Sequence, residues 1–243
     1  MKLNEMTIAQ RLTTVYEKIR LAEQQYGRKP GSVQLLAVSK TRPIRDIQEA
    51  QHAGQTAFGE NYLQEALGKI TALATPEANT PPHMPHQWHF IGPIQSNKTR
   101  DIAEHFNWVH SLERIKIAQR LSEQRPKHLP PLSVCLQINI DNETSKSGLL
   151  PSDALLLAQQ IQELPQLKLR GLMAIPTPTT NFNLQRQSFR KLRELYEQLQ
   201  QQEIPLDTLS MGMSNDLQAA IAEGATLVRI GTAIFGPRVK SVQ

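Results

Sequence analysis

The sequence predicts an α/β fold, a (β/α)8 TIM barrel in which a closed sheet of parallel strands is ringed by helices, with one extra helix at the N-terminus. The length of 243 residues suits a single barrel of this kind, which takes about 250 residues. About eight short apolar runs alternate with longer amphipathic stretches, which is the signature of a parallel sheet. No Gly-x-Gly-x-x-Gly fingerprint follows the first run, so the main reason to favour a dinucleotide-binding fold is missing.

The elements can be assigned in order along the chain. Between about Asn4 and Gly27 apolar residues recur at helical spacing, so this segment is the predicted extra helix. The strands are predicted at Val33–Ser39, Gln55–Phe58, Gln87–Ile91, Trp108–His110, Leu132–Ile140, Lys168–Ala174, Thr208–Met211 and Thr226–Ile230. The helices between them are predicted at about Ile44–Ala53, Tyr62–Ala72, Lys98–His105, Glu113–Gln124, Ser152–Leu164, Asn183–Gln202 and Ser214–Ala222. These elements use up the chain, so we expect residues 1–243 to form one domain, with the Pro-rich stretch Thr75–Pro85 as an inserted loop.

Composition and charge exclude several classes of protein. With 39% hydrophobic and 20% charged residues, the chain can fill one sizeable core. The net charge of +5 suits an anionic ligand, but the basic residues are scattered over predicted helices, which favours solvated faces over a nucleic-acid groove. Charged residues interrupt the first twenty positions, and no stretch approaches the roughly 18 apolar residues of a membrane span. We therefore expect a cytoplasmic protein that binds neither nucleic acid nor a membrane.

Cysteine and histidine offer little support for a metal site. Cys135 is the only cysteine and lies in an apolar run, so we expect a buried, inert thiol. His83, His86 and His89 repeat every three residues, but Pro85 breaks the helix that would align them and no carboxylate partner is adjacent. We expect no metal there. The segment at residues 96–100 has two possible interpretations, an anion site at the start of a helix or an ordinary helix cap.

The ends of the predicted strands carry the chemistry, because barrels of this kind build their active sites there. The first strand ends in Lys40, and alternation places Lys40 on the same side as Val38 and opposite Ser39. Two interpretations stay open on these residues alone. Lys40 is either a solvent-exposed amine or a Schiff-base lysine whose ammonium form is destabilised by desolvation or by a neighbouring cation.

The loops after the seventh and eighth strands predict an anion site opposite Lys40. Ser214 leads into a helix and is expected to cap it, which offers a hydroxyl and nearby N–H groups. Gly231 lets the backbone approach a ligand closely, and Thr232 adds a donor where a short helix begins. Phosphate sites in these barrels are frequently built from the same two loops. The pairing on adjacent strand ends therefore favours a bound phosphate.

Seven motifs resemble the pyridoxal phosphate homeostasis protein family. They recur in the family's order over nearly the whole chain: LLAVSKT (35–41), FGENY (58–62), HFIGPIQSNK (89–98), SKSG (145–148), RGLMAI (170–175), LSMGMS (209–214) and VRIGTAIFG (228–236). The resemblance implies a barrel like the N-terminal domain of alanine racemase and pyridoxal 5′-phosphate (PLP) held as a Schiff base. It also implies intracellular vitamin B6 and amino-acid homeostasis, with no established catalytic reaction.

The resemblance assigns cofactor-binding roles to eight residues and suggests partners. Lys40 would carry PLP, Ser214, Gly231 and Thr232 would hold the phosphate, and Arg229 would face the pyridine nitrogen, with Asn61, Met173 and Met213 around the cofactor. Because a guanidinium stays charged, Arg229 would leave that nitrogen unprotonated and weaken the ring as an electron sink. We expect a monomer that binds PLP, with other B6 vitamers and apo PLP enzymes as further candidate partners.

Three other functions are weighed against this one. A racemase-like PLP enzyme shares the barrel and the arginine, although such racemases resemble two-domain proteins whose second domain supplies an acid–base residue. A Schiff-base aldolase would use Lys40 without a cofactor, and a nucleic-acid binder has only the net charge in its favour. Lys146, in a Ser/Gly-rich turn, is expected to be an exposed amine that could hold a second PLP during transfer.

Overall fold

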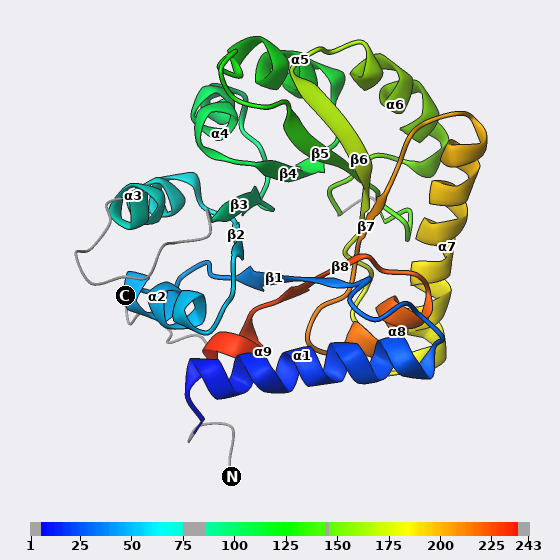
Figure 1. The fold of residues 1–243 in the computed structure, drawn as a ribbon. Helices are drawn as coiled ribbons and strands as arrows, with labels where there is room; N and C mark the ends of the chain where they lie inside the picture. The colour runs from blue at the N-terminus through cyan, green and yellow to red at the C-terminus, as the bar shows by residue number, and fades with distance from the viewer. Residues whose placement is uncertain (1–5, 75–85, 144–145, 238–243) are drawn as a thin grey trace.

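The computed structural model describes residues 6–74, 86–143 and 146–237, and the predicted loop Thr75–Pro85 lies outside these ranges. Eight strands form a closed, parallel barrel in the order β1 to β8, with helices around it (Figure 1). The strands are β1 (Gln34–Val38), β2 (Ala57–Glu60), β3 (Gln87–Phe90), β4 (Trp108–Leu112), β5 (Leu132–Gln137), β6 (Leu167–Met173), β7 (Thr208–Ser210) and β8 (Leu227–Ile230). The predicted fold class is confirmed.

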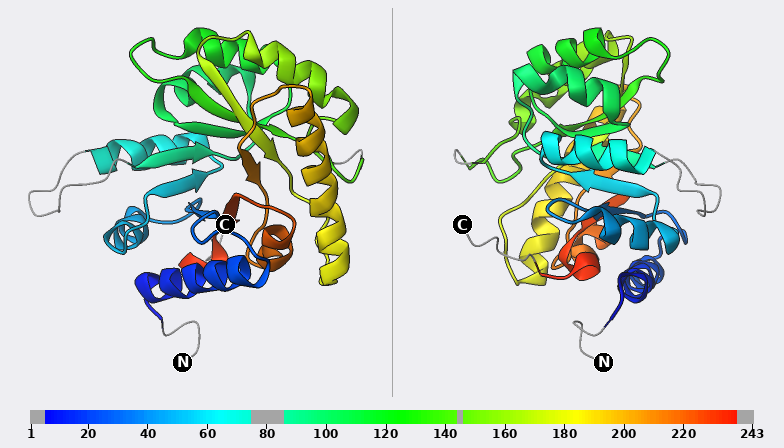
Figure 2. Two further views of the ribbon diagram at one scale, coloured as in Figure 1. Left: turned by 45° about the vertical axis from the view of Figure 1, so that its right-hand side comes forward. Right: turned by 90° about the vertical axis from the view of Figure 1, so that its left-hand side faces the viewer.

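The helices ring the sheet, as Figures 1 and 2 show. They are α1 (Ile8–Gln25), α2 (Ile44–His52), α3 (Leu63–Ala74), α4 (Thr99–His105), α5 (Ile115–Gln124), α6 (Ala154–Gln162), α7 (Phe182–Gln201), α8 (Leu217–Ala222) and α9 (Thr232–Phe235). Short 3-10 turns, η2 (Ser96–Lys98) and η3 (Pro151–Asp153), precede α4 and α6. The predicted segment at residues 96–100 contains η2, where the Ser96 carbonyl accepts hydrogen bonds from the Thr99 hydroxyl and from the Arg120 side chain. Among the described residues no side chain caps η2 or α4, so an ordinary helix cap gains no support, and the anion site stays a prediction.

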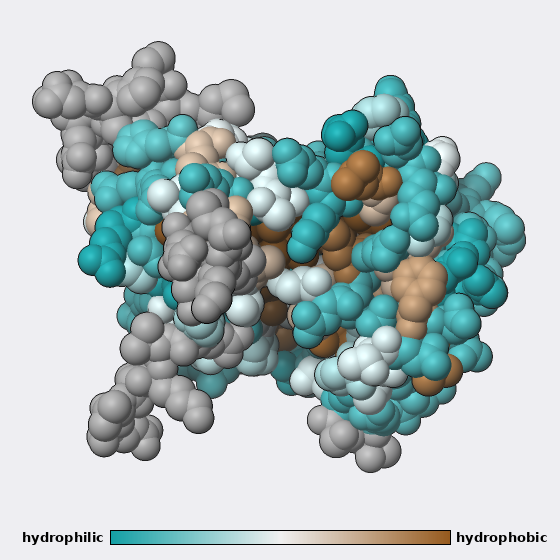
Figure 3. Space-filling model, turned by 90° about the horizontal axis from the view of Figure 1, so that it is seen from below, coloured by the Kyte–Doolittle hydropathy of each residue, from teal (hydrophilic) through white to brown (hydrophobic). Residues whose placement is uncertain are grey.

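The extra helix α1 is amphipathic and packs outside the barrel against α2, α8 and α9. Thr7 and Gln10 form a capping box that satisfies the first free N–H groups of this helix. Its apolar stripe, which includes Leu12 and Val15, is buried. The face of the molecule that carries α1 is mostly hydrophilic, and apolar residues line a hollow near its middle (Figure 3).

The barrel closes because β1 pairs in parallel with β8, with Gln34–Ala37 alongside Leu227–Ile230. One close approach in the sheet depends on glycine. A Cβ atom on Gly171 would lie 1.7 Å from the carbonyl oxygen of Thr208, so no larger residue fits where β6 meets β7. Around this point Trp108, Cys135 and Met173 form a small buried cluster. The predicted burial of Cys135 is confirmed, and burial raises the pKa of its thiol to about 12.

Strand and helix boundaries differ from the predictions by a few residues, and two of these differences have a clear cause. β5 ends at Gln137 instead of Ile140, because the Asn139 side chain hydrogen-bonds the carbonyls of Glu143 and Lys146 and turns the chain. α8 begins at Leu217 instead of Ser214, because a turn precedes it. Within the described ranges, no helix is long and apolar enough to cross a membrane.

Candidate functional site

A cavity of about 1200 Å³ opens at the carboxyl ends of the strands. All eight residues predicted to surround a cofactor lie in its wall: Lys40, Asn61, Met173, Met213, Ser214, Arg229, Gly231 and Thr232. They come from the ends of β1, β2, β6, β7 and β8 and from the start of α9. The fold therefore brings together side chains that are up to 192 positions apart in the sequence. Their contacts with a bound cofactor stay a prediction.

Lys40 enters the cavity because of the alternation along β1. Val38 and Lys40 both line the cavity, whereas Ser39 points the other way and is fully buried behind the sheet. Thr41 then adopts φ of 62°, a left-handed conformation that non-glycine residues rarely take. This turn ends the strand and leads into α2, so the lysine lies where the backbone changes direction.

The two loops predicted to hold a phosphate lie side by side in the cavity wall. A Cβ atom on Gly231 would lie 3.3 Å from the Val38 carbonyl oxygen, so only glycine leaves the β8 end this close to β1 without adjustment. Thr232 opens α9, as predicted. Ser214 lines the cavity, but the prediction that it caps α8 is wrong: Asp216 precedes that helix, and its carboxylate accepts the N–H of Met213 at 2.5 Å. This carboxylate–backbone bond stabilises a turn over residues 214–216 and delays the helix.

Arg229 is held rigidly between two strand ends at the base of the cavity. Its guanidinium donates to the Ala174 carbonyl at 2.9 Å and to the Ser210 hydroxyl at 2.8 Å, and it also contacts the Ser210 carbonyl. Burial lowers the pKa of Arg229 to about 10, with partial compensation from the Asp216 carboxylate, so the group stays charged at neutral pH. A fixed cation therefore forms part of the cavity base.

Two buried histidines extend this hydrogen-bond chain into the barrel. His110 shares one ring nitrogen with the Ser210 hydroxyl at 2.8 Å and the other with His89 at 2.9 Å. His89 stacks on Trp108, with ring centroids 5.3 Å apart. This chain was not predicted from the sequence, because His110 was assigned only to a strand, and His89 only to a strand, a family motif and a metal-site alternative. Their shared inward phase on adjacent strands, β3 and β4, is the signal that could have found them.

Both histidines are kept neutral by their surroundings. Burial lowers the pKa of His89 to about 3, and burial, reinforced by His89 and Arg229, lowers the pKa of His110 well below its usual value of 6.5. The metal interpretation of the predicted trio gains no support: His83 lies outside the described residues, and among the residues described no group of three potential ligands comes together.

This burial predicts an acid-sensitive fold. Below pH 6.5 the unfolded chain binds protons that the folded state does not bind. The free energy of unfolding should therefore fall by about 2 kcal/mol from His89 between pH 7.5 and 5, and His110 should lower it further in the same direction. Urea unfolding of a His89→Gln/His110→Gln protein should show a much flatter pH dependence than the wild type. A His52→Gln protein, changed at an exposed site on α2, should keep the wild-type slope. Equal slopes in all three proteins would contradict the assignment.

The remaining predicted residues differ in how firmly they are held. Met173 is fully buried, whereas Met213 is 36% exposed at the rim. Asn61 lies against Gly92, where a Cβ atom would come within 2.2 Å of the Asn61 carbonyl oxygen. The cavity thus combines a rigid base with a more open edge.

The wall formed by the loop after β6 was not predicted. It includes Ile175, Pro176 and Pro178, followed by Phe182 at the start of α7. The motif RGLMAI reaches only the first of these residues, and the later positions carry no pattern that separates a cavity wall from an ordinary connecting loop. Apolar side chains here widen the cavity beyond the eight predicted residues.

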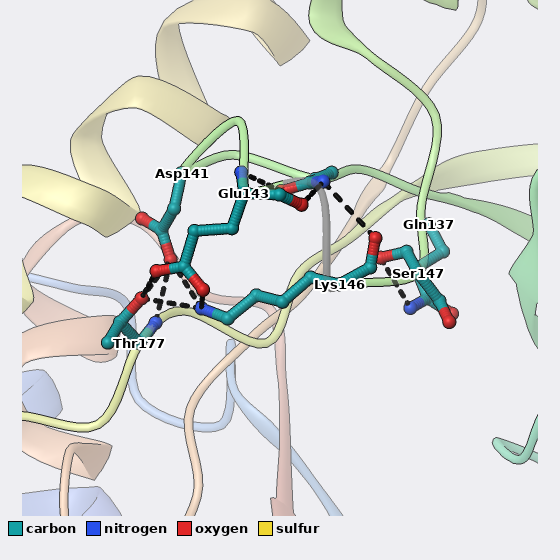
Figure 4. Close-up of polar contacts among 7 residues, drawn as sticks. Gln137, Asp141, Glu143, Lys146, Ser147 and Thr177 are labelled. Atoms are coloured by element: carbon teal, nitrogen blue, oxygen red, sulfur yellow. Dashed lines mark hydrogen bonds and ion pairs between the residues drawn. The ribbon is translucent and has the colours of Figure 1, made fainter.

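Lys146 is not the exposed amine that the sequence suggested. Its side chain is 25% exposed, and its ammonium group contacts Asp141 at 2.7 Å and Thr177 at 2.5 Å (Figure 4). Burial would raise the pKa of Asp141, but the hydrogen bonds from Lys146 and Thr177 hold it below its usual value. The ion pair lies within the loop after β5, and the hydrogen bond to Thr177 joins this loop to the loop after β6. A transfer role would require Lys146 to leave both contacts.

The fold and the cavity together define the class of protein to which this chain belongs. Residues 11–239 match the family described as alanine racemase, N-terminal domain, so this is a barrel protein of that class. Within it, the chain belongs to the pyridoxal phosphate homeostasis protein family. It is 60% identical over 232 residues to the family member from Pseudomonas aeruginosa, with 96% of each chain covered. The member from Escherichia coli is 49% identical over 231 residues, which cover 95% of this chain and 97% of that one. The family predicted from the sequence motifs is confirmed.

Solved structures agree with this assignment. PipY of Synechococcus elongatus, whose structure contains bound PLP, superimposes with a TM-score of 0.79 at 37% identity, covering 95% of this chain and all 100% of PipY. Alanine racemase from Corynebacterium glutamicum superimposes with a TM-score of 0.66 at 14% identity, covering 96% of this chain and 63% of the racemase. The second likeness concerns the fold alone.

Proposed function

We propose that this protein binds PLP as a Schiff base on Lys40 and carries or buffers it in intracellular vitamin B6 homeostasis, without turning over a substrate. The observation that carries the proposal is the convergence of the eight predicted residues on one cavity. PLP binding by PipY and the family's name support it. The predicted cytoplasmic location and contact with apo PLP enzymes belong to the same proposal.

The residues of the cavity fit each part of PLP. An aldehyde needs an amine, and Lys40 is the lysine in the described part of the cavity wall. A phosphate needs donors and a close backbone, which Ser214, Gly231 and Thr232 offer on adjacent loops. The charged Arg229 would donate to the pyridine nitrogen and so disfavour its protonation. Such an environment suits storage of the cofactor better than stabilisation of a carbanion.

The test combines binding with delivery. The purified protein should develop a visible absorption band with PLP and lose this band on borohydride reduction. In a separate sample that is not reduced, the PLP-loaded protein should restore the activity of an apo PLP enzyme as it releases the cofactor. A protein that never forms the band, or forms it and never yields PLP to any apo-enzyme over hours, would contradict the proposal. An aldolase would show neither the band nor the delivery.

The alternative function is a racemase-like activity, favoured by the shared barrel and by Arg229 in the cavity base. Racemisation needs proton exchange on both sides of a substrate carbon. Besides Lys40, the described wall offers Asp216, whose carboxylate already accepts the Met213 N–H. We therefore expect no D-isomers after incubation of the PLP-loaded protein with L-amino acids. Their accumulation in proportion to protein would establish the alternative.

The phosphate assignment predicts a selective loss of affinity. A Ser214→Ala/Thr232→Val protein should bind PLP about 10 to 100 times more weakly, because each hydrogen bond to a charged group contributes about 1.5–3 kcal/mol before partial replacement by water. Its affinity for pyridoxal, which lacks the phosphate, should change less than about twofold by the same reasoning. Spectroscopic titration with both vitamers measures the difference. Parallel losses for PLP and pyridoxal would place the phosphate elsewhere.

A further inference from the structure

A buried ion cluster lies directly behind the strand end that carries Lys40. Lys69, on α3, is 4% exposed, and its ammonium group donates to the Ser39 carbonyl at 2.8 Å, to Glu60 at 2.7 Å and to Glu65 at 2.5 Å. The Ser39 hydroxyl also donates to Glu60 at 2.6 Å. A single cation thus joins the ends of β1 and β2 to the helix outside them.

The members of this cluster flank residues of the cavity in the sequence. Ser39 precedes Lys40, and Glu60 precedes Asn61. Because neighbouring strand residues point to opposite sides, the cluster faces the helices while Lys40 and Asn61 face the cavity. Holding Ser39 and Glu60 from behind therefore fixes the backbone from which both cavity residues extend.

The cluster also holds the far side of Lys40. The Glu65 carboxylate accepts the N–H of Thr41 at 2.5 Å, and Thr41 is the residue with φ of 62°. A left-handed conformation at a non-glycine residue persists only where the surroundings enforce it. Through Ser39 on one side and Glu65 on the other, Lys69 ties down the backbone before and after Lys40.

Stability alone does not account for burying these charges. Replacing a buried ion pair with apolar residues of similar volume is often neutral or stabilising, because desolvation offsets the attraction. Here burial also raises the pKa of Glu60 against the opposing effect of Lys69, and the second carboxylate oxygen of Glu60 has no hydrogen-bond partner among the residues that the structure describes. An arrangement that is costly to bury but fixed in geometry is suited to orientation.

We propose that Lys69 is a positioning residue that sets the direction from which Lys40 attacks the PLP aldehyde, acting through Ser39, Glu60 and Glu65. This inference rests on the proposed function. Formation of the bond requires the unprotonated lysine nitrogen to approach the aldehyde carbon from one face of the carbonyl group. The nitrogen forms a double bond to this carbon, and its two protons leave with the carbonyl oxygen as water. A displacement of about 1 Å at such a centre can slow a reaction by about a hundredfold.

The experiment compares two variants with a matched control. Lys69→Met removes the cation at similar length, and Glu65→Ala removes the acceptor of the Thr41 N–H from a partly exposed position. Glu223→Gln weakens another ion cluster, in which a carboxylate whose side chain is 2% exposed binds three arginines of α7 beside the end of α8. Stopped-flow absorbance gives the rate constant of bond formation with PLP, and thermal unfolding gives the stability of each protein.

We expect the rate constant to fall about tenfold in Lys69→Met and a few-fold in Glu65→Ala. Glu223→Gln should lose stability and keep the wild-type rate. A folded Lys69→Met protein with the wild-type rate would overturn the inference, and if that variant fails to fold, an unchanged rate in Glu65→Ala would do so. Absence of the borohydride-trapped adduct in the wild type itself would instead refute the proposed function.

Discussion

Replacing Lys40 with alanine is expected to abolish the visible absorption band that the wild-type protein forms with PLP. The amine supplies the covalent bond, and holding the two reacting groups together in the cavity contributes an effective concentration that the remaining contacts cannot replace. The affinity for PLP should fall by about 100-fold or more by the same reasoning. Titration of the variant with PLP, followed by absorbance, gives both the intensity of the band and the affinity for PLP.

Lys116→Ala is the matched control for this prediction. Lys116 lies on α5 and its side chain is exposed, so its loss removes a reactive amine without touching the cavity. This variant should bind PLP as the wild type does. If Lys40→Ala kept the band and the affinity, the bond would have to form on another lysine and the assignment of the cavity would be wrong.

Replacing Arg229 with leucine is expected to damage both the fold and the site. The change leaves the Ala174 carbonyl and the Ser210 hydroxyl without the guanidinium that they now contact in a buried setting. Each buried polar group left unpaired costs about 1–3 kcal/mol, so the free energy of unfolding should fall by about 3 kcal/mol. The affinity for PLP should also fall about tenfold or more, because the donor to the pyridine nitrogen is lost.

Arg28→Leu separates these two effects. Arg28 likewise bridges two carbonyls, those of Ile221 and Ala225, at 3.1 Å each, but it does not line the cavity. Its loss should lower stability measured by urea unfolding while PLP affinity stays unchanged. Equal effects of the two variants on PLP affinity would show that Arg229 acts only through stability.

The barrel could be predicted from the sequence because its signals are local and repeated. Each strand is a short apolar run, and the intervening helices carry amphipathic periodicity, so errors at single boundaries did not alter the topology. The boundary at α8 failed because the Asp216 carboxylate competes for the backbone at Met213, a contact that composition does not reveal. The pairing of β6 with β7 at Gly171 depends on one close approach, which is visible only in three dimensions.

The cavity residues could be predicted to a large extent because strand ends converge in a barrel and because the motifs resemble a known family. The position of Lys40 and Thr232 just after an apolar run was enough to predict that both residues lie at the mouth of the barrel. The chain from Arg229 through Ser210 to His110 could not be predicted in the same way, since it joins three strands, β8, β7 and β4, that are not all neighbours in the sequence. The cluster around Lys69 was missed for a related reason: a lysine on an amphipathic helix is usually solvated, and only the packing of α3 buries this one.

The most direct test of the central claim is a peptide map after borohydride reduction. The protein, loaded with one molar equivalent of PLP, is reduced, digested and analysed by mass spectrometry. We expect a single major adduct, a reduced phosphopyridoxyl group on the peptide that contains Lys40. An adduct found mainly on another lysine, such as Lys146, or no adduct at all while PLP remains bound, would contradict it.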